Sequence, residues 1–144
     1  MAGKTGAGAG AAAAVGAAVD GSEVGPEDRW INVGVVRGPC SGAPEVRVLE
    51  SGSRLATLAI RCPAGDGRAT SVPVTVWDPP AWVEQVGPGD ELVVVGRMRR
   101  RFYQHPGGVG SRVDLEADLV GRARDRRRVE AALRRALAAL EPLG

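Results

Sequence analysis

Residues 97–103 read Arg-Met-Arg-Arg-Arg-Phe-Tyr, and their side chains are the ones in this chain best suited to binding chemistry. Arginine presents a planar fork of N–H donors that matches a phosphate, and its flat cation also stacks on bases. In a strand, alternate residues share a face. One side would carry Arg97, Arg99, Arg101 and Tyr103, and the other Arg100 and Phe102. The run predicts a basic finger that follows a nucleic-acid backbone and stacks bases on its rings; the alternative is an edge strand kept soluble by charge.

The formal net charge of +2 hides an asymmetry along the chain. Residues 1–90 carry 7 basic and 10 acidic side chains, and residues 91–144 carry 12 basic and 7 acidic ones, so net charges of −3 and +5 give the total. Of the 19 basic residues, 18 are arginine. GC-rich coding would favour Arg, Ala and Gly together, but it does not explain why the arginines gather in the last third. This clustering favours a polyanionic partner.

Residues suited to catalysis or metal binding are few and poorly spaced. The single histidine, His105, lies between a glutamine and a proline at an expected hairpin tip. Cys40 and Cys62 have no CxxC spacing, so buried neutral thiols are expected rather than a metal site or a disulfide scaffold. The three alternating carboxylates of residues 114–118 are expected on a solvated strand face. We therefore expect no enzyme active site, no metal and no cofactor.

The elements that must position these residues follow from the hydrophobic period and the turn signals. Strands are expected at residues 30–40, 45–49 after a turn, 55–60, 70–78, 91–103 and 112–120, with a short helix at 81–86 and an amphipathic helix at 123–141. We count residues 30–49 as one interrupted strand. The chain is then mainly β: a five-stranded OB-fold Greek-key barrel with one short internal helix and an appended C-terminal helix. A sandwich also gives five short strands.

The domain boundaries follow from composition. Residues 1–28 form an Ala- and Gly-rich arm that we expect to be disordered, residues 29–121 the OB-fold domain, and residues 122–144 a basic amphipathic helix. The apolar stripe of that helix is expected to pack on the barrel, or alternatively to pair with a neighbouring chain; it comprises Val129, Leu133, Ala136, Leu137 and Leu140. No apolar run reaches the roughly 18 residues of a membrane span, so no membrane partner is expected.

The order of these motifs resembles the bacterial single-stranded-DNA-binding protein family, in a variant similar to actinobacterial members. Asn32 opens the first stretch, which continues through Gly42-Ala43-Pro44-Glu45-Val46-Arg47 to Ser51-Gly52 and the Leu55–Ile60 strand. The second stretch is Val72 to Trp77, and the third runs from Gly89-Asp90-Glu91 to Arg99 and on through the finger that closes at residues 113–120. The resemblance covers about residues 30–121.

The resemblance implies an OB-fold protein that coats and protects single-stranded DNA in replication, recombination or repair, without base specificity and without catalysis. It implies a homo-oligomer, a tetramer or a dimer, in the cytoplasm at the nucleoid. Trp77 matches a base-stacking position, and Arg47, Arg97, Arg99 and Arg100 match basic ones. The candidate nucleic-acid-binding residues are Arg47, Arg61, Trp77, Arg97, Arg99, Arg100, Arg101, Phe102, Tyr103 and Arg112.

The chain departs from the family pattern in two places. A stacking tryptophan expected near Ser71 is missing, and the sequence ends in a basic helix and Leu143-Gly144 instead of an acidic, phenylalanine-ended recruiting tip, which we expect to be absent. These differences keep two alternatives open: a degenerate OB-fold paralogue that acts as a protein-interaction or assembly module, and an RNA-binding OB domain.

Overall fold

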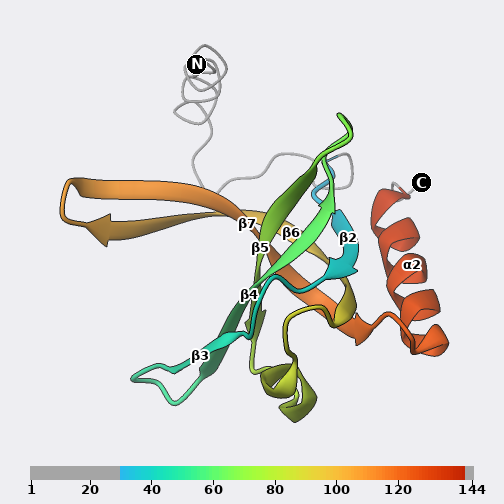
Figure 1. The fold of residues 1–144 in the computed structure, drawn as a ribbon, viewed down its shortest axis with the longest axis horizontal. Coiled ribbons are helices and arrows are strands. Elements are labelled where there is room, and N and C mark those ends of the chain that lie inside the picture. Colours follow the sequence, from blue (N-terminus) through green and yellow to red (C-terminus); the bar gives the residue numbers. More distant parts are fainter. Residues whose placement is uncertain (1–29, 142–144) are drawn as a thin grey trace. The chain divides into compact units, whose positions relative to one another are not determined.

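The computed structural model describes residues 30–141, within which Asn32–Glu141 form one compact unit. The arm expected at residues 1–28 lies outside the described residues. The unit is mainly β (Figure 1). Its elements are β2 (Gly34–Pro39), β3 (Glu45–Val48), β4 (Arg54–Pro63), β5 (Ala69–Trp77), the 3₁₀ helix η2 (Ala81–Gln85), β6 (Glu91–His105), β7 (Gly108–Arg122) and α2 (Arg126–Leu140).

Six strands form a single sheet in the order β2-β6-β7-β5-β4-β3. All neighbouring strands pair antiparallel except β5 and β7, which run parallel. The parallel pair brings the end of β5 beside the middle of β7, with Thr75 opposite Glu116. Two segments 41 residues apart in the chain thereby lie side by side in the sheet.

The structure has six strands where five were expected, and the sheet is not closed into a barrel. The stretch counted as one interrupted strand breaks between Cys40 and Pro44 into β2 and β3, which pair with different neighbours and lie at opposite ends of the strand order. An isolated bridge between Cys40 and Ile60 and the hydrogen bond from Ser41 N to Ala59 O (3.0 Å) are what bring the end of β2 beside β4.

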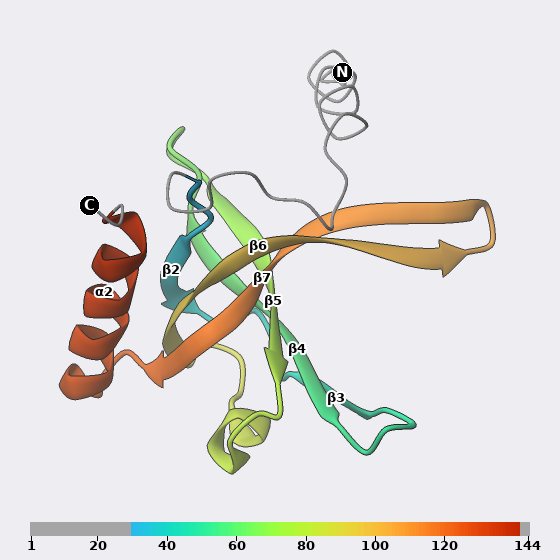
Figure 2. The ribbon, with the colours of Figure 1, turned by 180° about the vertical axis from the view of Figure 1, so that it is seen from behind.

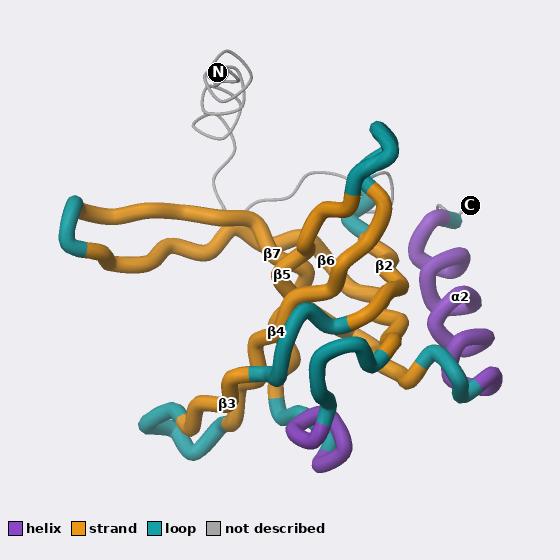
Figure 3. Tube along the Cα trace, viewed as in Figure 1, coloured by secondary structure: helices purple, strands orange, loops and turns teal. Residues whose placement is uncertain are grey.

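Strands β6 and β7 form a long hairpin that projects beyond the other strands (Figures 1 and 2). Its register runs from Leu92 opposite Arg122 to His105 opposite Gly108, with one shift at Val95/Gly96. Gly96 is required at that shift because a Cβ there would lie 1.9 Å from the Glu116 carbonyl oxygen. The hairpin carries the expected finger outward and returns the chain along β7 toward α2 (Figure 3).

Two apolar clusters hold the unit together. One lies inside the curved sheet around Ile60, Val74, Leu92 and Leu115, and includes Val83 of η2. In the other, Ala132 and Ala136 of α2 pack against Val93 and Val95 of β6. Each Å² of apolar surface buried contributes about 25 cal/mol to stability. The first cluster contains more buried side chains than the second, so it is the main source of stability.

Helix α2 thus packs on the sheet through its alanines and leaves its larger apolar side chains outside. Leu133, Leu137 and Leu140 are 50%, 63% and 46% exposed. The expected packing on the barrel therefore holds for only part of the predicted stripe. No helix within residues 30–141 is both long enough and apolar enough to cross a membrane.

Candidate nucleic-acid interface

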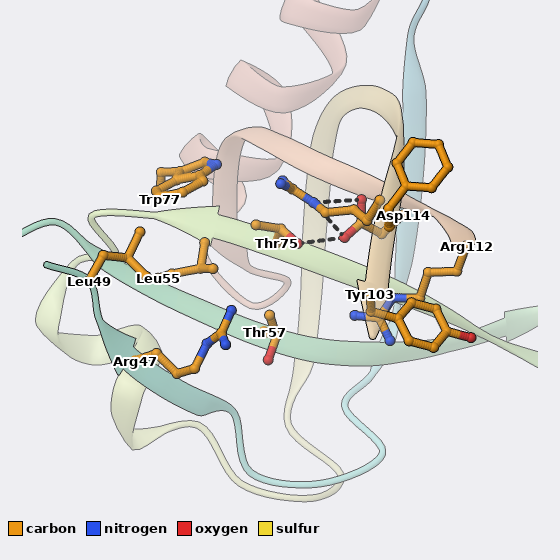
Figure 4. Close-up of a pocket in the computed structure, with 11 residues that line it drawn as sticks. Arg47, Leu49, Leu55, Thr57, Thr75, Trp77, Tyr103, Arg112 and Asp114 are labelled. Carbon is orange, nitrogen blue, oxygen red and sulfur yellow. Dashed lines mark hydrogen bonds and ion pairs between the residues drawn. The ribbon is translucent and has the colours of Figure 1, made fainter. Parts of the chain in front are cut away.

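An open groove of about 600 Å³ lies where β3, β4 and β5 face residues 101–103 and 112–114 of the β6–β7 hairpin (Figure 4). It is lined by Arg47, Leu49, Leu55, Thr57, Thr75, Trp77, Arg101, Phe102, Tyr103, Arg112 and Asp114. Six of these are among the ten candidate residues of the sequence. In the close-up, Trp77 and Tyr103 lie at opposite ends of the groove, with Thr57 and Thr75 between them.

Trp77 ends β5 and is held in a fixed orientation. Its indole Nε1–H donates to Glu116 Oε2 at 2.6 Å, and the Arg101 guanidinium carbon lies 5.9 Å from the ring centroid, within reach of a cation–π interaction. The side chain nevertheless remains 38% exposed. Trp77 is therefore an oriented aromatic surface that is still open to a ligand.

The first two of the three alternating carboxylates of β7 are buried, so the expectation of a solvated acidic face is wrong for them. Asp114 is 0% and Glu116 is 7% exposed. Asp114 accepts a hydrogen bond from Thr75 Oγ1 at 2.7 Å and forms an ion pair with Arg101 Nε at 3.2 Å. The parallel strand β5 covers this part of β7 with Thr75 and Trp77, which the alternation pattern alone did not reveal.

Three arginines of the 97–103 run are ion-paired within the protein. Arg97 pairs with Asp118 at 3.2 Å, Arg99 with Glu116 at 3.3 Å, and Arg101 with both buried carboxylates. An ion-paired arginine must exchange its carboxylate for a phosphate, so its net contribution to binding is smaller than that of a free cation. The run is consequently less basic than its sequence implies.

The remaining arginine of the run, Arg100, points to a different partner and donates to Ser111 Oγ at 3.2 Å. Arg61 lies exposed on β4 opposite Ser71. Neither residue lines the groove, and the same holds for Arg97 and Arg99. The structure thus separates four of the ten candidates from the other six.

The arginines of the groove without a carboxylate partner lie outside the run. Arg47 of β3 and Arg112 of β7 are exposed, both line the groove, and neither forms an ion pair with any residue between 30 and 141. They approach the groove from different strands (Figure 4). Arg47 and Arg112 can therefore bind a phosphate without first giving up a carboxylate partner among the described residues.

Tyr103 and Phe102 add two further rings at the hairpin side of the groove. The Tyr103 ring lies over Gly110 on the opposite strand, where an added Cβ would come within 2.6 Å of Tyr103 Cζ. Any residue with a Cβ at position 110 would collide with the Tyr103 ring, so this ring position requires glycine there. Phe102 belongs to the other face by alternation, lines the groove edge and is 71% exposed.

The sequence analysis did not predict that carboxylates neutralise the arginine run, although the short hairpin turn in the sequence indicates it. A tight turn at residues 106–107 sets a register in which Arg99 faces Asp114 and Arg97 faces Glu116. Opposite charges at facing positions of a hairpin attract each other. Within residues 30–141, no three His, Cys, Asp or Glu side chains gather in a way that could hold a metal ion.

Comparison with known proteins identifies the fold. No protein-family model matches the sequence, and no curated protein matches it in sequence. The single-stranded DNA binding protein from Thermus aquaticus is structurally similar: a deletion variant superposes with a TM-score of 0.56 at 20% identity, covering 69% of this chain and 44% of that one. The wild-type protein gives 0.53 at 20% identity, covering 64% and 40%. The chain spans less than half the length of these structures, and it shares with them the fold of a single-stranded DNA binding protein.

Proposed function

We propose that this protein binds single-stranded DNA, without base specificity, in the groove between β3–β5 and the β6–β7 hairpin. The observation that carries the proposal is the convergence of three exposed rings, Trp77, Phe102 and Tyr103, with two arginines, Arg47 and Arg112, that form no ion pair within residues 30–141. Rings and cations from separate segments meet in one open groove, on a fold similar to that of a single-stranded DNA binding protein.

The rings provide stacking surfaces for bases, and the arginines provide phosphate contacts. Stacking contributes about 1–3 kcal/mol per base and accepts any base, since every base has a π-face. The hydroxyl of Thr75, which could read a base edge, already donates to Asp114. The groove therefore favours binding that depends on strand flexibility and charge instead of base identity.

The arginine run has mainly a positioning role in this account. Arg101 lies over Trp77, and Glu116 binds both the indole N–H and Arg99, so the ion-pair network fixes the stacking surface before a strand arrives. A surface fixed in advance loses less conformational entropy on binding than a mobile one.

The broader role is also proposed. We place the chain in the bacterial single-stranded-DNA-binding family, as an actinobacterial-like variant that coats and protects DNA during replication, recombination or repair in the cytoplasm at the nucleoid. We propose residues 29–121 as the DNA-binding domain. Assembly as a homo-oligomer, a tetramer or a dimer, is supported by the exposed Leu133, Leu137 and Leu140.

The test is a titration of a labelled dT oligonucleotide at several salt concentrations. Binding at micromolar concentration or tighter that weakens with salt is expected, and no binding at low salt contradicts the proposal. Arg112→Gln should weaken binding about fivefold at 0.1 M salt, because one phosphate contact contributes a slope of about 0.7 in log K against log salt. Arg68→Gln is the matched control, because Arg68 is exposed, lies outside the groove and, like Arg112, forms no ion pair with any residue between 30 and 141.

Two parallel measurements address the alternatives. The same titration with rU compares RNA with DNA, and tighter binding to rU assigns the groove to RNA. Native mass with and without a long oligonucleotide reports assembly and binding together. Assembly without any nucleic-acid binding would favour the interaction module.

A further inference from the structure

A second arginine-rich surface lies at the end of β7 and the start of α2. Residues 122–135 contain seven arginines and two acidic residues, a local net charge of +5. The arginines are Arg122, Arg124, Arg126, Arg127, Arg128, Arg134 and Arg135. We refer to the first five as the α2 arginine surface.

This surface differs from the arginine run of the hairpin because carboxylates do not neutralise it. In the described part of the chain, none of its five arginines forms an ion pair, whereas Arg97, Arg99 and Arg101 all do. Asp125 caps the helix by accepting the backbone N–H of Arg128 at 3.2 Å. The strongest uncompensated positive charge of the unit is therefore here and not on the hairpin.

Helix stability does not account for these arginines. The positive end of the helix dipole lies at the N-terminus, where cations are unfavourable by roughly 0.3–1 kcal/mol each. Arg126 and Arg127 nevertheless lie in the first turn, which has no acidic residue, beside Arg128, whose Nη2 donates to the Val120 carbonyl oxygen at 2.8 Å and ties the helix to β7. Such a placement costs stability unless an anion binds.

An aromatic ring accompanies the arginines. Trp82 of η2 is half-buried against the core, and the Arg122 guanidinium carbon lies 4.9 Å from its ring centroid. Trp82, Arg122, Asp125 and Arg128 surround a depression of about 290 Å³. The surface thus combines a ring with cations, as the groove does.

Arg128 connects the α2 arginine surface to the groove. Trp77 lines the groove and also a depression of about 220 Å³ that Arg128 lines as well. Arg128 in turn lines the depression beside Trp82. Two carboxylates border this route, but Asp118 is paired with Arg97 and Asp78 accepts the backbone N–H of Arg54.

We propose that a single strand bound in the groove continues past Trp77 onto the α2 arginine surface, so that the outer side of the sheet extends the binding site. This inference rests on the proposed function of the groove. The length of the extension follows from β7: Arg122 lies six residues after Glu116, whose carboxylate binds Trp77. At 3.3 Å per residue, this is a distance of about 20 Å. At about 3.4 Å per stacked nucleotide, the extension accommodates at most roughly six nucleotides.

The test compares two matched double variants on dT oligomers of increasing length, from about 6 to 30 nucleotides. R126Q/R127Q removes two charges from the α2 arginine surface, and R134Q/R135Q removes two from the far half of the same helix. Two phosphate contacts change the salt slope by about 1.4, so R126Q/R127Q should weaken binding of long oligomers roughly 25-fold at 0.1 M salt. Binding of the shortest oligomers should be unchanged, and R134Q/R135Q should match the wild type at every length.

Each other outcome has a definite meaning. Equal losses for both double variants would show a general charge effect and overturn the extended path, as would an unchanged affinity for long oligomers. A loss on short oligomers as well would place the two arginines in the groove site and also overturn it. Failure of the wild type to bind any length would contradict the proposed function itself. Thermal unfolding checks that R126Q/R127Q folds, and its midpoint should not fall, since the helix dipole disfavours both arginines.

Discussion

Replacing Glu116 by glutamine tests whether the ion-pair network restrains Arg99, which shares this carboxylate with the groove residues Trp77 and Arg101. The side chain accepts the Trp77 N–H at 2.6 Å and pairs with Arg99 at 3.3 Å and with Arg101 at 3.5 Å. Glutamine keeps an acceptor oxygen for the indole but removes the charge. Arg101 stays paired with Asp114 at 3.2 Å, whereas Arg99, whose side chain is 54% exposed, loses its carboxylate partner.

The expected result is tighter DNA binding with a steeper salt dependence. One released arginine adds about 0.7 to the slope of log K against log salt, which corresponds to roughly a fivefold gain in affinity at 0.1 M salt. The folded state should lose only about 1 kcal/mol, because partly exposed ion pairs contribute little and the Trp77 hydrogen bond is retained. Fluorescence anisotropy with labelled dT at four salt concentrations measures both quantities.

Glu84→Gln is the matched control for this variant. Glu84 pairs with Arg54 at 2.6 Å, so its substitution also removes one negative charge and releases one arginine, but Glu84, unlike Glu116, binds neither Trp77 nor Arg101 of the groove. The control should leave affinity and salt slope near the wild-type values. If Glu116→Gln has the same affinity and slope as the control, the carboxylates do not restrain the arginines and the reasoning is refuted.

Two further predictions concern the hairpin and the core. Gly110→Ala should displace the Tyr103 ring and weaken DNA binding by the 1–3 kcal/mol of one stacking platform, about 5- to 150-fold. The same substitution should have no effect on binding in a Tyr103→Ala background. An equal loss in both backgrounds would exclude displacement of the Tyr103 ring as the cause. Burial, and secondarily the charge of Asp90, raises the pKa of the Cys40 thiol from 9.0 to about 11. The unfolded chain therefore loses this proton at a lower pH than the folded one. Denaturant titrations should show the free energy of unfolding falling as pH rises from about 9 to 11, at up to about 1.4 kcal/mol per pH unit. The fall should be larger in the wild type than in Cys40→Ala. Identical pH profiles of the two proteins would contradict that assignment.

The strands and helices were largely predictable because their periods are strong. Alternating valines gave 70–78 for the observed Ala69–Trp77, and the helical stripe gave 123–141 for Arg126–Leu140. What escaped prediction depends on contacts distant in sequence. Nothing local shows that β2 and β3 take different neighbours, because that depends on the pairing of β2 with β6 and of β3 with β4.

The face that α2 buries was also beyond the sequence pattern. The stripe predicted buried leucines, but the helix approaches the sheet closely enough that Ala132 and Ala136 fill the contact, and Gly121 lies against Arg128 Cβ. Small residues permit such an approach, so the leucines are left outside. Hydrophobicity alone ranks leucine above alanine and therefore centres the buried face on the leucines, although Val129 and Ala136 of the predicted stripe do pack on the sheet.

For the candidate site, composition located the rings but misjudged the charges. Trp77, expected from the family resemblance, and Phe102 and Tyr103 of the predicted finger all line one groove, and their role as stacking residues stays a prediction. The arginines beside them are held by Asp114 and Glu116, because the hairpin register and the parallel β5–β7 pairing place acids where they meet bases. A count of charges along the chain cannot show which of them neutralise one another.

Binding in the groove can be tested by photochemical crosslinking of a dT oligonucleotide that carries 5-iododeoxyuridine, followed by mass spectrometry of the crosslinked peptides. The iodinated base reacts with the aromatic side chain on which it stacks, so it reports the stacking residue itself. If the strand lies in the groove, crosslinks are expected at Trp77, Phe102 or Tyr103, and fewer of them as salt weakens binding. Crosslinks confined to residues outside the groove, from a protein that binds the oligonucleotide, would contradict binding in the groove.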